Sequence, residues 1–164
     1  MRNEKYLLLF ALAGLLMITP RNLSRFSESE FRGWFGDMSP VLLSKLDDFA
    51  QYWGGPVIIS PHPDALGRHD GPEGLSQHNV DKWGEVRAVD VFPKHPNGNY
   101  VDDLAGRQKM LAVAKRAGFT GIGIYTDTQP GNMIHLDVRD DRTVLNRAMW
   151  SRVDGNYGEI RSVV

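Results

Sequence analysis

The chain contains no cysteine among its 164 residues. A disulfide framework and a thiolate metal site are therefore both excluded, and any bound metal ion must be held by histidine, aspartate or glutamate. An excess of one charge is also lacking, because 19 Lys and Arg stand against 20 Asp and Glu and give a net charge of -1. Nucleic-acid-binding proteins carry a basic surface, so this balance argues against nucleic acid as a partner.

A long hydrophobic run is missing too. Residues 6–18 are an uncharged, mainly apolar stretch of only thirteen residues. As a helix this stretch would rise about 20 Å, whereas the hydrocarbon core of a bilayer is about 30 Å thick. Its length suits the apolar part of a secretory signal, yet no small-x-small cleavage site follows it.

Three interpretations of the first 20 residues remain open. Residues 1–20 can be an uncleaved export signal or short membrane anchor, which would place the protein at a membrane facing the periplasm or the cell exterior. Alternatively, residues 6–18 can form an apolar helix that packs on a membrane or virion protein. The third interpretation is a cleavable signal. In each case we expect a linker over residues 21–38 and one domain over residues 39–164.

Helices and strands are expected to follow one another along that domain. Ser39 and Pro40 can begin a helix, since serine caps free N–H groups and proline is tolerated at the first helical position. Apolar residues then recur at helical spacing until Gly54 ends the segment. Similar patterns predict helices over 101–117 and 142–150, strands over 56–60, 87–91, 121–126 and 133–138, and irregular segments over 61–76 and 79–85. The elements together indicate an α+β fold with a small, largely antiparallel sheet and flanking helices, plus an N-terminal apolar helix.

The strand over residues 133–138 has two chemically different faces. Ile134, Leu136 and Val138 share one face and are expected in the core, whereas His135 and Asp137 share the other. Upstream, Asp90 lies in an otherwise apolar strand, where an unpaired charge would be costly. Together, His78, Asp90 and His135 supply two imidazoles and a carboxylate. Zinc accepts such a set, and a catalytic zinc needs three protein ligands and one position left for water.

Four segments of the chain carry a resemblance to a known family. They are Leu75–His78, Arg87–Val91, Gly121–Tyr125 and Ile134–Arg139. In these segments the chain resembles the zinc D-alanyl-D-alanine carboxypeptidase-like family of bacterial cell-wall peptidases and phage endolysins. The fold of that family is related to the Hedgehog signalling domain, and the similarity extends over residues 26–140.

The resemblance implies a zinc cofactor, a peptidoglycan peptide as substrate, and His78, Asp90 and His135 as metal ligands. It also places Arg68 where the family often carries an arginine that holds the substrate carboxylate, and a guanidinium can bind such a group bidentately. His62, His69 and His95 are expected to be loop residues rather than ligands.

The chain departs from the family pattern in two places. Eleven residues, Asn79 to Val89, separate the first two ligands. This is more than the family usually has, so residues 79–85 must bulge outward if the ligands are to meet.

The second departure concerns the general base. Many members carry an acidic base three residues before the last ligand, where this chain has Asn132, which cannot accept a proton. Candidate replacements are Glu85, Asp137 and Asp127. We expect Asp137 to orient a ligand or to pair with Arg139, which leaves Glu85 as the first choice for the base.

Three functions are therefore open. The first is a zinc metallopeptidase that hydrolyses peptidoglycan stem peptides in cell-wall lysis or remodelling, including a phage virion-associated lysin. The second is a catalytically inactive zinc-binding module that grips the cell wall or a virion partner, which Asn132 and the long insertion favour. The third is a structural membrane protein whose His and Asp residues bind nothing. The sequence leaves open whether a peptidase of this kind would be an endopeptidase or a carboxypeptidase.

Overall fold

The computed structural model describes residues 23–164. The predicted apolar helix and the export or anchor segment fall on residues 1–20 and so lie outside the described residues. Within residues 23–164 no helix combines the length and the apolar character that crossing a bilayer requires.

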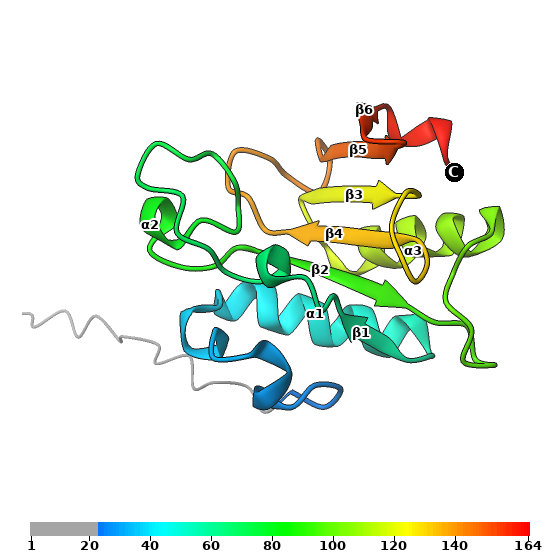
Figure 1. The fold of residues 1–164 in the computed structure, drawn as a ribbon, viewed down its shortest axis with the longest axis horizontal. Coiled ribbons are helices and arrows are strands. Elements are labelled where there is room, and N and C mark those ends of the chain that lie inside the picture. Colours follow the sequence, from blue (N-terminus) through cyan, green and yellow to red (C-terminus); the bar gives the residue numbers. More distant parts are fainter. Residues whose placement is uncertain (1–22) are drawn as a thin grey trace, which may run out of the picture.

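A mixed six-stranded sheet forms the centre of the molecule (Figure 1). Its strands are β1 (Val57–Ile59), β2 (Ala88–Pro93), β3 (Gly121–Tyr125), β4 (Met133–Asp137), β5 (Ala148–Val153) and β6 (Asn156–Gly158). They lie in the order β1-β2-β4-β3-β5-β6. All neighbouring pairs are antiparallel except β3 and β5, which run parallel. The α+β prediction and the mainly antiparallel sheet are therefore confirmed.

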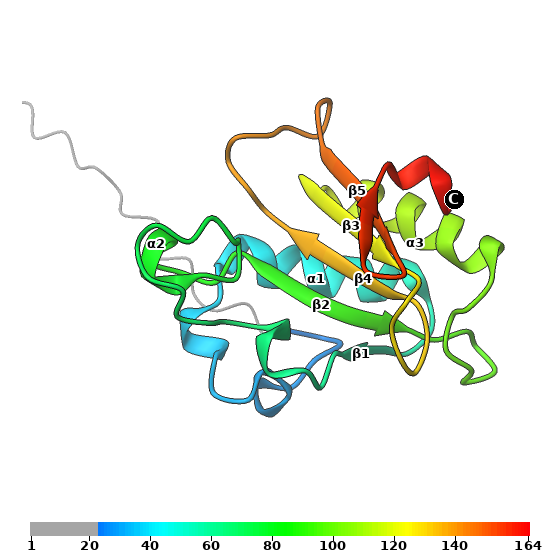
Figure 2. The same ribbon diagram turned by 45° about the horizontal axis from the view of Figure 1, so that its top comes forward.

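Two long helices cover one face of this sheet. Figures 1 and 2 place α1 (Pro40–Trp53) and α3 (Leu104–Ala117) on the same side of the strands. The helix α1 begins at Pro40, as the sequence predicts, and is ended by its C-cap Gly54, whose φ of 74° suits glycine. The helix α3 begins at Leu104 rather than Val101, because the Asp103 side chain accepts a hydrogen bond from the Gly106 N–H and caps it there.

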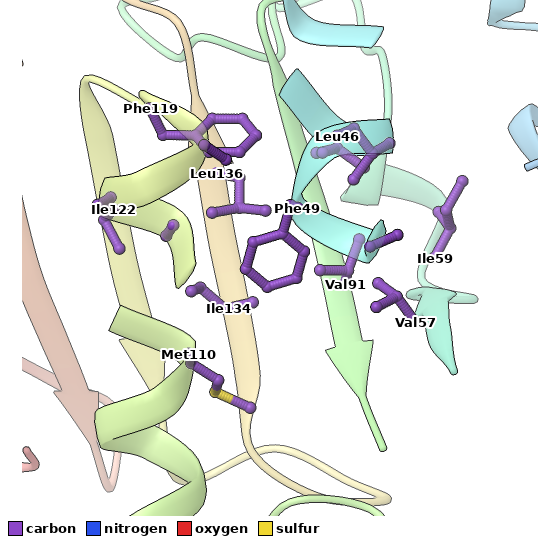
Figure 3. Close-up of a cluster of buried hydrophobic side chains, with 14 of the residues drawn as sticks. Leu46, Phe49, Val57, Ile59, Val91, Met110, Phe119, Ile122, Ile134 and Leu136 are labelled. Atoms are coloured by element: carbon purple, nitrogen blue, oxygen red, sulfur yellow. The ribbon is translucent and has the colours of Figure 1, made fainter. Parts of the chain in front are cut away.

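The hydrophobic core lies between these helices and the sheet (Figure 3). Phe49 of α1 and Met110 of α3 are fully buried, as are Ile134 and Leu136 of β4. Truncation of such a side chain to alanine typically lowers the free energy of unfolding by about 2–5 kcal/mol. The burial of Ile134 and Leu136 directs their neighbours to the opposite face of β4, so His135 faces away from the core.

The predicted helix over residues 142–150 is wrong. Its last residues belong to β5, which pairs with β3 through residues far apart in the sequence. In this register Trp150 lies opposite Gly123, and a Cβ added at Gly123 would stand only 2.5 Å from the indole ring. Pairing with β3 therefore decides the local conformation. The expectation for residues 79–85 also needs correction, since α2 (Val80–Trp83) forms a helical turn there.

The segment before α1 packs against the rest of the structure. Phe26 and Phe31 are buried in the same core cluster as the helices. Arg32 donates hydrogen bonds to the carbonyl oxygens of Ser60 and Pro61, at 2.8 and 2.7 Å. These contacts hold residues 26–32 beside the loop that follows β1.

Candidate metal centre

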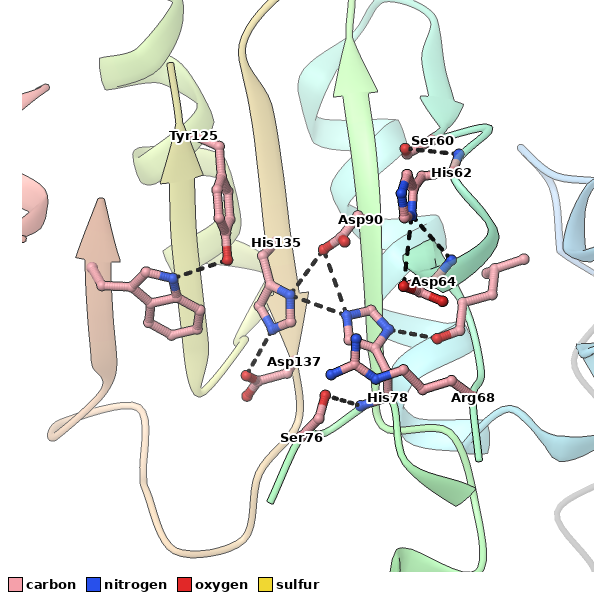
Figure 4. A network of polar contacts seen from close by, with 12 residues as sticks. Ser60, His62, Asp64, Arg68, Ser76, His78, Asp90, Tyr125, His135 and Asp137 are labelled. Atoms are coloured by element: carbon pink, nitrogen blue, oxygen red, sulfur yellow. Dashed lines mark hydrogen bonds and ion pairs between the residues drawn. The ribbon is translucent and has the colours of Figure 1, made fainter. Parts of the chain in front are cut away.

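Three side chains from separate segments meet on the face of the sheet opposite the helices (Figure 4). Asp90 of β2 and His135 of β4 are register partners, so their side chains project side by side. His78 reaches them from the loop before α2. One ligand atom from each residue lies within 4.8 Å of the other two. The three predicted ligands therefore form a group that can hold a metal ion.

The distances among these atoms suit a small ion. His135 Nδ1 lies 2.8 Å from Asp90 Oδ1 and 3.3 Å from His78 Nε2. The remaining distance, from His78 Nε2 to Asp90 Oδ1, is 3.6 Å. Ligands about 2.1 Å from a tetrahedral ion would lie about 3.4 Å apart. Only small movements of the side chains would complete such a geometry.

Each of the two imidazoles is oriented by a hydrogen bond through the ring nitrogen that does not face the ligand group. His78 Nδ1 donates to the carbonyl oxygen of Leu66 at 2.5 Å, which leaves Nε2 facing Asp90. His135 Nε2 bonds to Asp137 Oδ2 at 3.1 Å, which leaves Nδ1 facing the same carboxylate. Bonds of this kind fix the tautomer of a ligand histidine and raise its basicity.

Asp137 is fully buried, and its carboxylate also bonds to Arg139. Arg139 Nε donates to Asp137 Oδ1 at 2.9 Å, and Arg139 Nη2 donates to Asp137 Oδ2 at 2.5 Å. Gly121 makes the room for this pair, since a Cβ there would stand 2.0 Å from Asp137 Oδ1. Asp137 thus has both contacts that the sequence suggested, one to a predicted ligand and one to Arg139.

The electrostatics of the cluster favour a bound positive charge. Burial lowers the pKa of His135, but hydrogen bonds to Asp137 and Asp90 more than offset this and raise it to about 9. Burial raises the pKa of Asp90, but the hydrogen bond from His135 and the nearby imidazole of His78 hold it well below its usual range. Without a metal, a proton on His135 Nδ1 therefore stands between the ring and Asp90. A divalent cation at this position would replace that proton.

The inserted residues do not separate the ligands. Asn79 caps α2 by accepting a hydrogen bond from the Asp81 N–H, and Gly84 ends the turn with a φ of 70°. Figures 1 and 2 both show α2 at one end of the molecule, beyond the start of β2. The insertion thus points away from the centre. The backbone N–H of Arg68 donates to the carbonyl oxygen of His78 at 3.0 Å and fixes the loop on the other side.

A cavity of about 740 Å³ opens above the three ligands. Arg68 lines this cavity, and its Nε is paired with Asp70 at 2.6 Å. Glu85 does not line it and instead accepts a hydrogen bond from Arg87 Nε at 3.1 Å. Asp127 does not line it either, since its carboxylate pairs with Arg152 at 3.0 Å.

The other three histidines take no part in the ligand group. His62 lines the cavity, where its Nδ1 accepts a hydrogen bond from the Asp64 N–H. His69 bonds to Asp81 at 2.6 Å, and His95 pairs with Asp103 at 3.2 Å.

Sequence reasoning missed the aromatic wall of the cavity. The ring of Trp150 lies 5.1 Å from that of His135, and its Nε1 donates to Tyr125 Oη at 3.2 Å. Burial is the main cause that raises the pKa of the Tyr125 hydroxyl. The signal was present in β3, where glycine at 121 and 123 alternates with isoleucine. Glycine at every second position leaves one face bare, and Trp150 and Asp137 occupy that space.

Comparison of the chain with protein-family models, with curated proteins and with solved structures finds no match.

Proposed function

We propose that the protein is a zinc-dependent peptidase that hydrolyses peptidoglycan stem peptides. The observation that carries the proposal is the convergence of His78, Asp90 and His135, at spacings that suit a tetrahedral ion, beneath a cavity large enough for a peptide. Two imidazole nitrogens and one carboxylate oxygen match the ligands of catalytic zinc sites. Calcium and magnesium prefer oxygen ligands throughout, so zinc is the ion that we propose.

Zinc bound here would supply a Lewis acid and lower the pKa of a coordinated water toward about 7. The chain's own groups have separate tasks. Asp137 holds His135 with Nδ1 turned toward the ligand group. Trp150 packs beside His135 and forms part of the cavity wall. Arg68 lines the cavity and can donate hydrogen bonds to substrate oxygen atoms.

The position of the proton acceptor follows from the cavity lining. Among the described residues that line the cavity, only Asp64 and Asp90 carry a carboxylate, and Asp90 belongs to the ligand group. Asp64 follows β1, and its side chain is more than half exposed. We therefore prefer Asp64 to Glu85 as the group that takes the proton of the attacking water, because a general base must reach that water.

Peptidoglycan as the substrate is part of the same proposal. It is supported by the motif resemblance and by the apolar segment over residues 6–18, which suits export or anchoring of the enzyme at the membrane or in a virion. The wall substrate lies on that outer side of the membrane. Lysis or remodelling of the wall would be the biological outcome.

A second function, a zinc-binding module without catalysis, is favoured by one observation. Asn132, which replaces the family's usual acid, is buried and its Oδ1 accepts a hydrogen bond from Arg107 Nη1 at 3.0 Å. This side chain therefore serves the packing of α3 on the hairpin between β3 and β4. Such a module would grip cell-wall peptide or a virion partner.

Metal analysis and a wall-clearing assay test the two functions. The peptidase proposal expects one zinc per chain and clearing of purified peptidoglycan, both abolished by His135→Ala. Zinc without clearing would support the binding module. Absence of zinc from a folded, zinc-supplemented protein would contradict both functions.

A further inference from the structure

We propose that the site cleaves internal bonds of its peptide, as an endopeptidase, rather than releasing a C-terminal residue. This inference rests on the proposed function and specifies the substrate class of the same site. It follows from the state of the arginines around the cavity. Each of them is already paired with an aspartate of this chain.

Among the described residues that line the cavity, the positively charged lysine or arginine side chains are three arginines: Arg68, Arg139 and Arg152. Arg68 Nε lies 2.6 Å from Asp70 Oδ2, and Arg139 Nη2 lies 2.5 Å from Asp137 Oδ2. Arg152 Nε lies 3.0 Å from both carboxylate oxygens of Asp127. The positive charges at the cavity wall are thus locally neutralised by the fold itself.

A carboxypeptidase needs the opposite arrangement. Its substrate brings a free carboxylate into the site. Moving an ionised carboxylate out of water costs free energy unless the site offers it a partner of opposite charge. An unpaired arginine would offset this cost through two parallel hydrogen bonds. Here the arriving carboxylate would meet Arg68 together with the negative charge of Asp70, and like charges close together are unfavourable. A neutral peptide group carries no such penalty.

The ligand group also has room for substrate on both sides. Figure 4 shows the Arg68 side chain next to His78 at one end of the ligand group, and Tyr125 beyond His135 at the other end. Both flanks of the cavity end in exposed side chains, since Leu75 is 77% exposed and Tyr157 is 67% exposed. A peptide that crosses the centre can therefore continue in both directions, as an internal bond requires.

Matched peptides test the inference. One synthetic stem peptide would be prepared with a free C-terminal carboxylate and again as its C-terminal amide, and both would be incubated with zinc-loaded full-length protein. Mass spectrometry of the fragments gives the bond that is cleaved. We expect both peptides to be cut at the same internal bond at similar rates. Release of the last residue from the free acid, with refusal of the amide, would overturn the inference but leave the peptidase proposal intact. Failure to cut either peptide, with zinc bound, would overturn both.

The variant Asp70→Asn tests the electrostatic cause. It leaves the charge of Arg68 uncompensated, so cleavage of the free acid should accelerate relative to the amide. The control Glu159→Gln removes an exposed acid that pairs with Arg161 and does not line the cavity. An acid-to-amide rate ratio that is the same in wild type and Asp70→Asn would contradict the role assigned to this pair.

Discussion

His135 Nε2 lies 3.1 Å from Asp137 Oδ2, and the two residues stand two positions apart on the same face of β4. The strand itself therefore aligns the imidazole with the carboxylate, since alternate side chains of a strand project in the same direction. Because Asp137 is fully buried beneath Arg139, the bond cannot be exchanged for one to bulk water.

Replacement of Asp137 should weaken the metal site without removing a ligand. Loss of such an orienting carboxylate typically lowers metal affinity by about 10–100-fold, and Asp137→Asn should fall in this range. Competition with a chromogenic chelator measures the affinity. The control Asp141→Asn changes an acid that is 62% exposed and pairs with Arg142. Equal zinc affinity in wild type and Asp137→Asn would show that the bond does not orient His135.

Zinc binding should release a proton below pH 9. The pKa of His135 is raised to about 9 in the metal-free protein, so the ring is protonated at neutral pH and must lose its proton to bind. Affinity should therefore rise with pH, by up to tenfold per unit, and level off above about pH 9. Calorimetry in buffers of different ionisation enthalpy counts the protons. No proton release at pH 7 would contradict the raised pKa.

The stability of the metal-free protein should depend on pH in the opposite sense. A raised pKa in the folded state means that protonated His135 stabilises the fold. This contribution is complete below the unfolded value of about 6.5 and disappears as the pH rises through 9. Thermal unfolding after chelation should therefore show a lower Tm at pH 9.5 than at pH 6. In His135→Gln this alkaline loss should be reduced.

Two acid-to-amide variants identify the proton acceptor. Asp64→Asn should retain zinc and lose most turnover, because general base catalysis typically contributes about 10²–10⁴-fold. Glu85→Gln should remain active, since Glu85 bonds to Arg87 and does not line the cavity. Hydrolysis rates and zinc content are measured together. The reverse result would restore Glu85 as the base.

Gly123→Ala tests the packing of the aromatic wall. The added methyl would stand 2.5 Å from the Trp150 indole, so the ring must move from its place beside His135. Overpacking of this kind typically lowers the free energy of unfolding by about 1–3 kcal/mol. Urea unfolding measures the loss, and tryptophan fluorescence reports the ring. Gly36→Ala is the matched control because nothing lies within 4 Å of its Cβ position.

The parts of the site that sequence could predict are those set by local periodicity. Alternation along residues 133–138 put Ile134 in the core and His135 on the opposite face, and both placements are confirmed. The isolated charge of Asp90 in an apolar strand indicated a cation partner, and the register of β2 with β4 brings it to His135. The two-residue period was sufficient to place these side chains because the two faces of each strand differ in chemistry.

The parts that escaped prediction depend on distant pairing. The segment that ends at Trp150 carries a weak helical pattern, and its conformation is decided by the parallel contact with β3. No local signal reports such a contact. The neutralised state of Arg68 was also missed, although Asp70 is only two residues away, because the loop conformation determines whether the two side chains meet.

His78 differs from its two companions in the element that carries it. Asp90 and His135 are fixed on adjacent strands, whereas His78 belongs to the connection between β1 and β2. An ion held by all three would act as a crosslink between that connection and the sheet. Extraction of the ion should therefore expose residues 66–78 to proteases before the strands lose protection, so that one wall of the cavity loosens while the core stays folded.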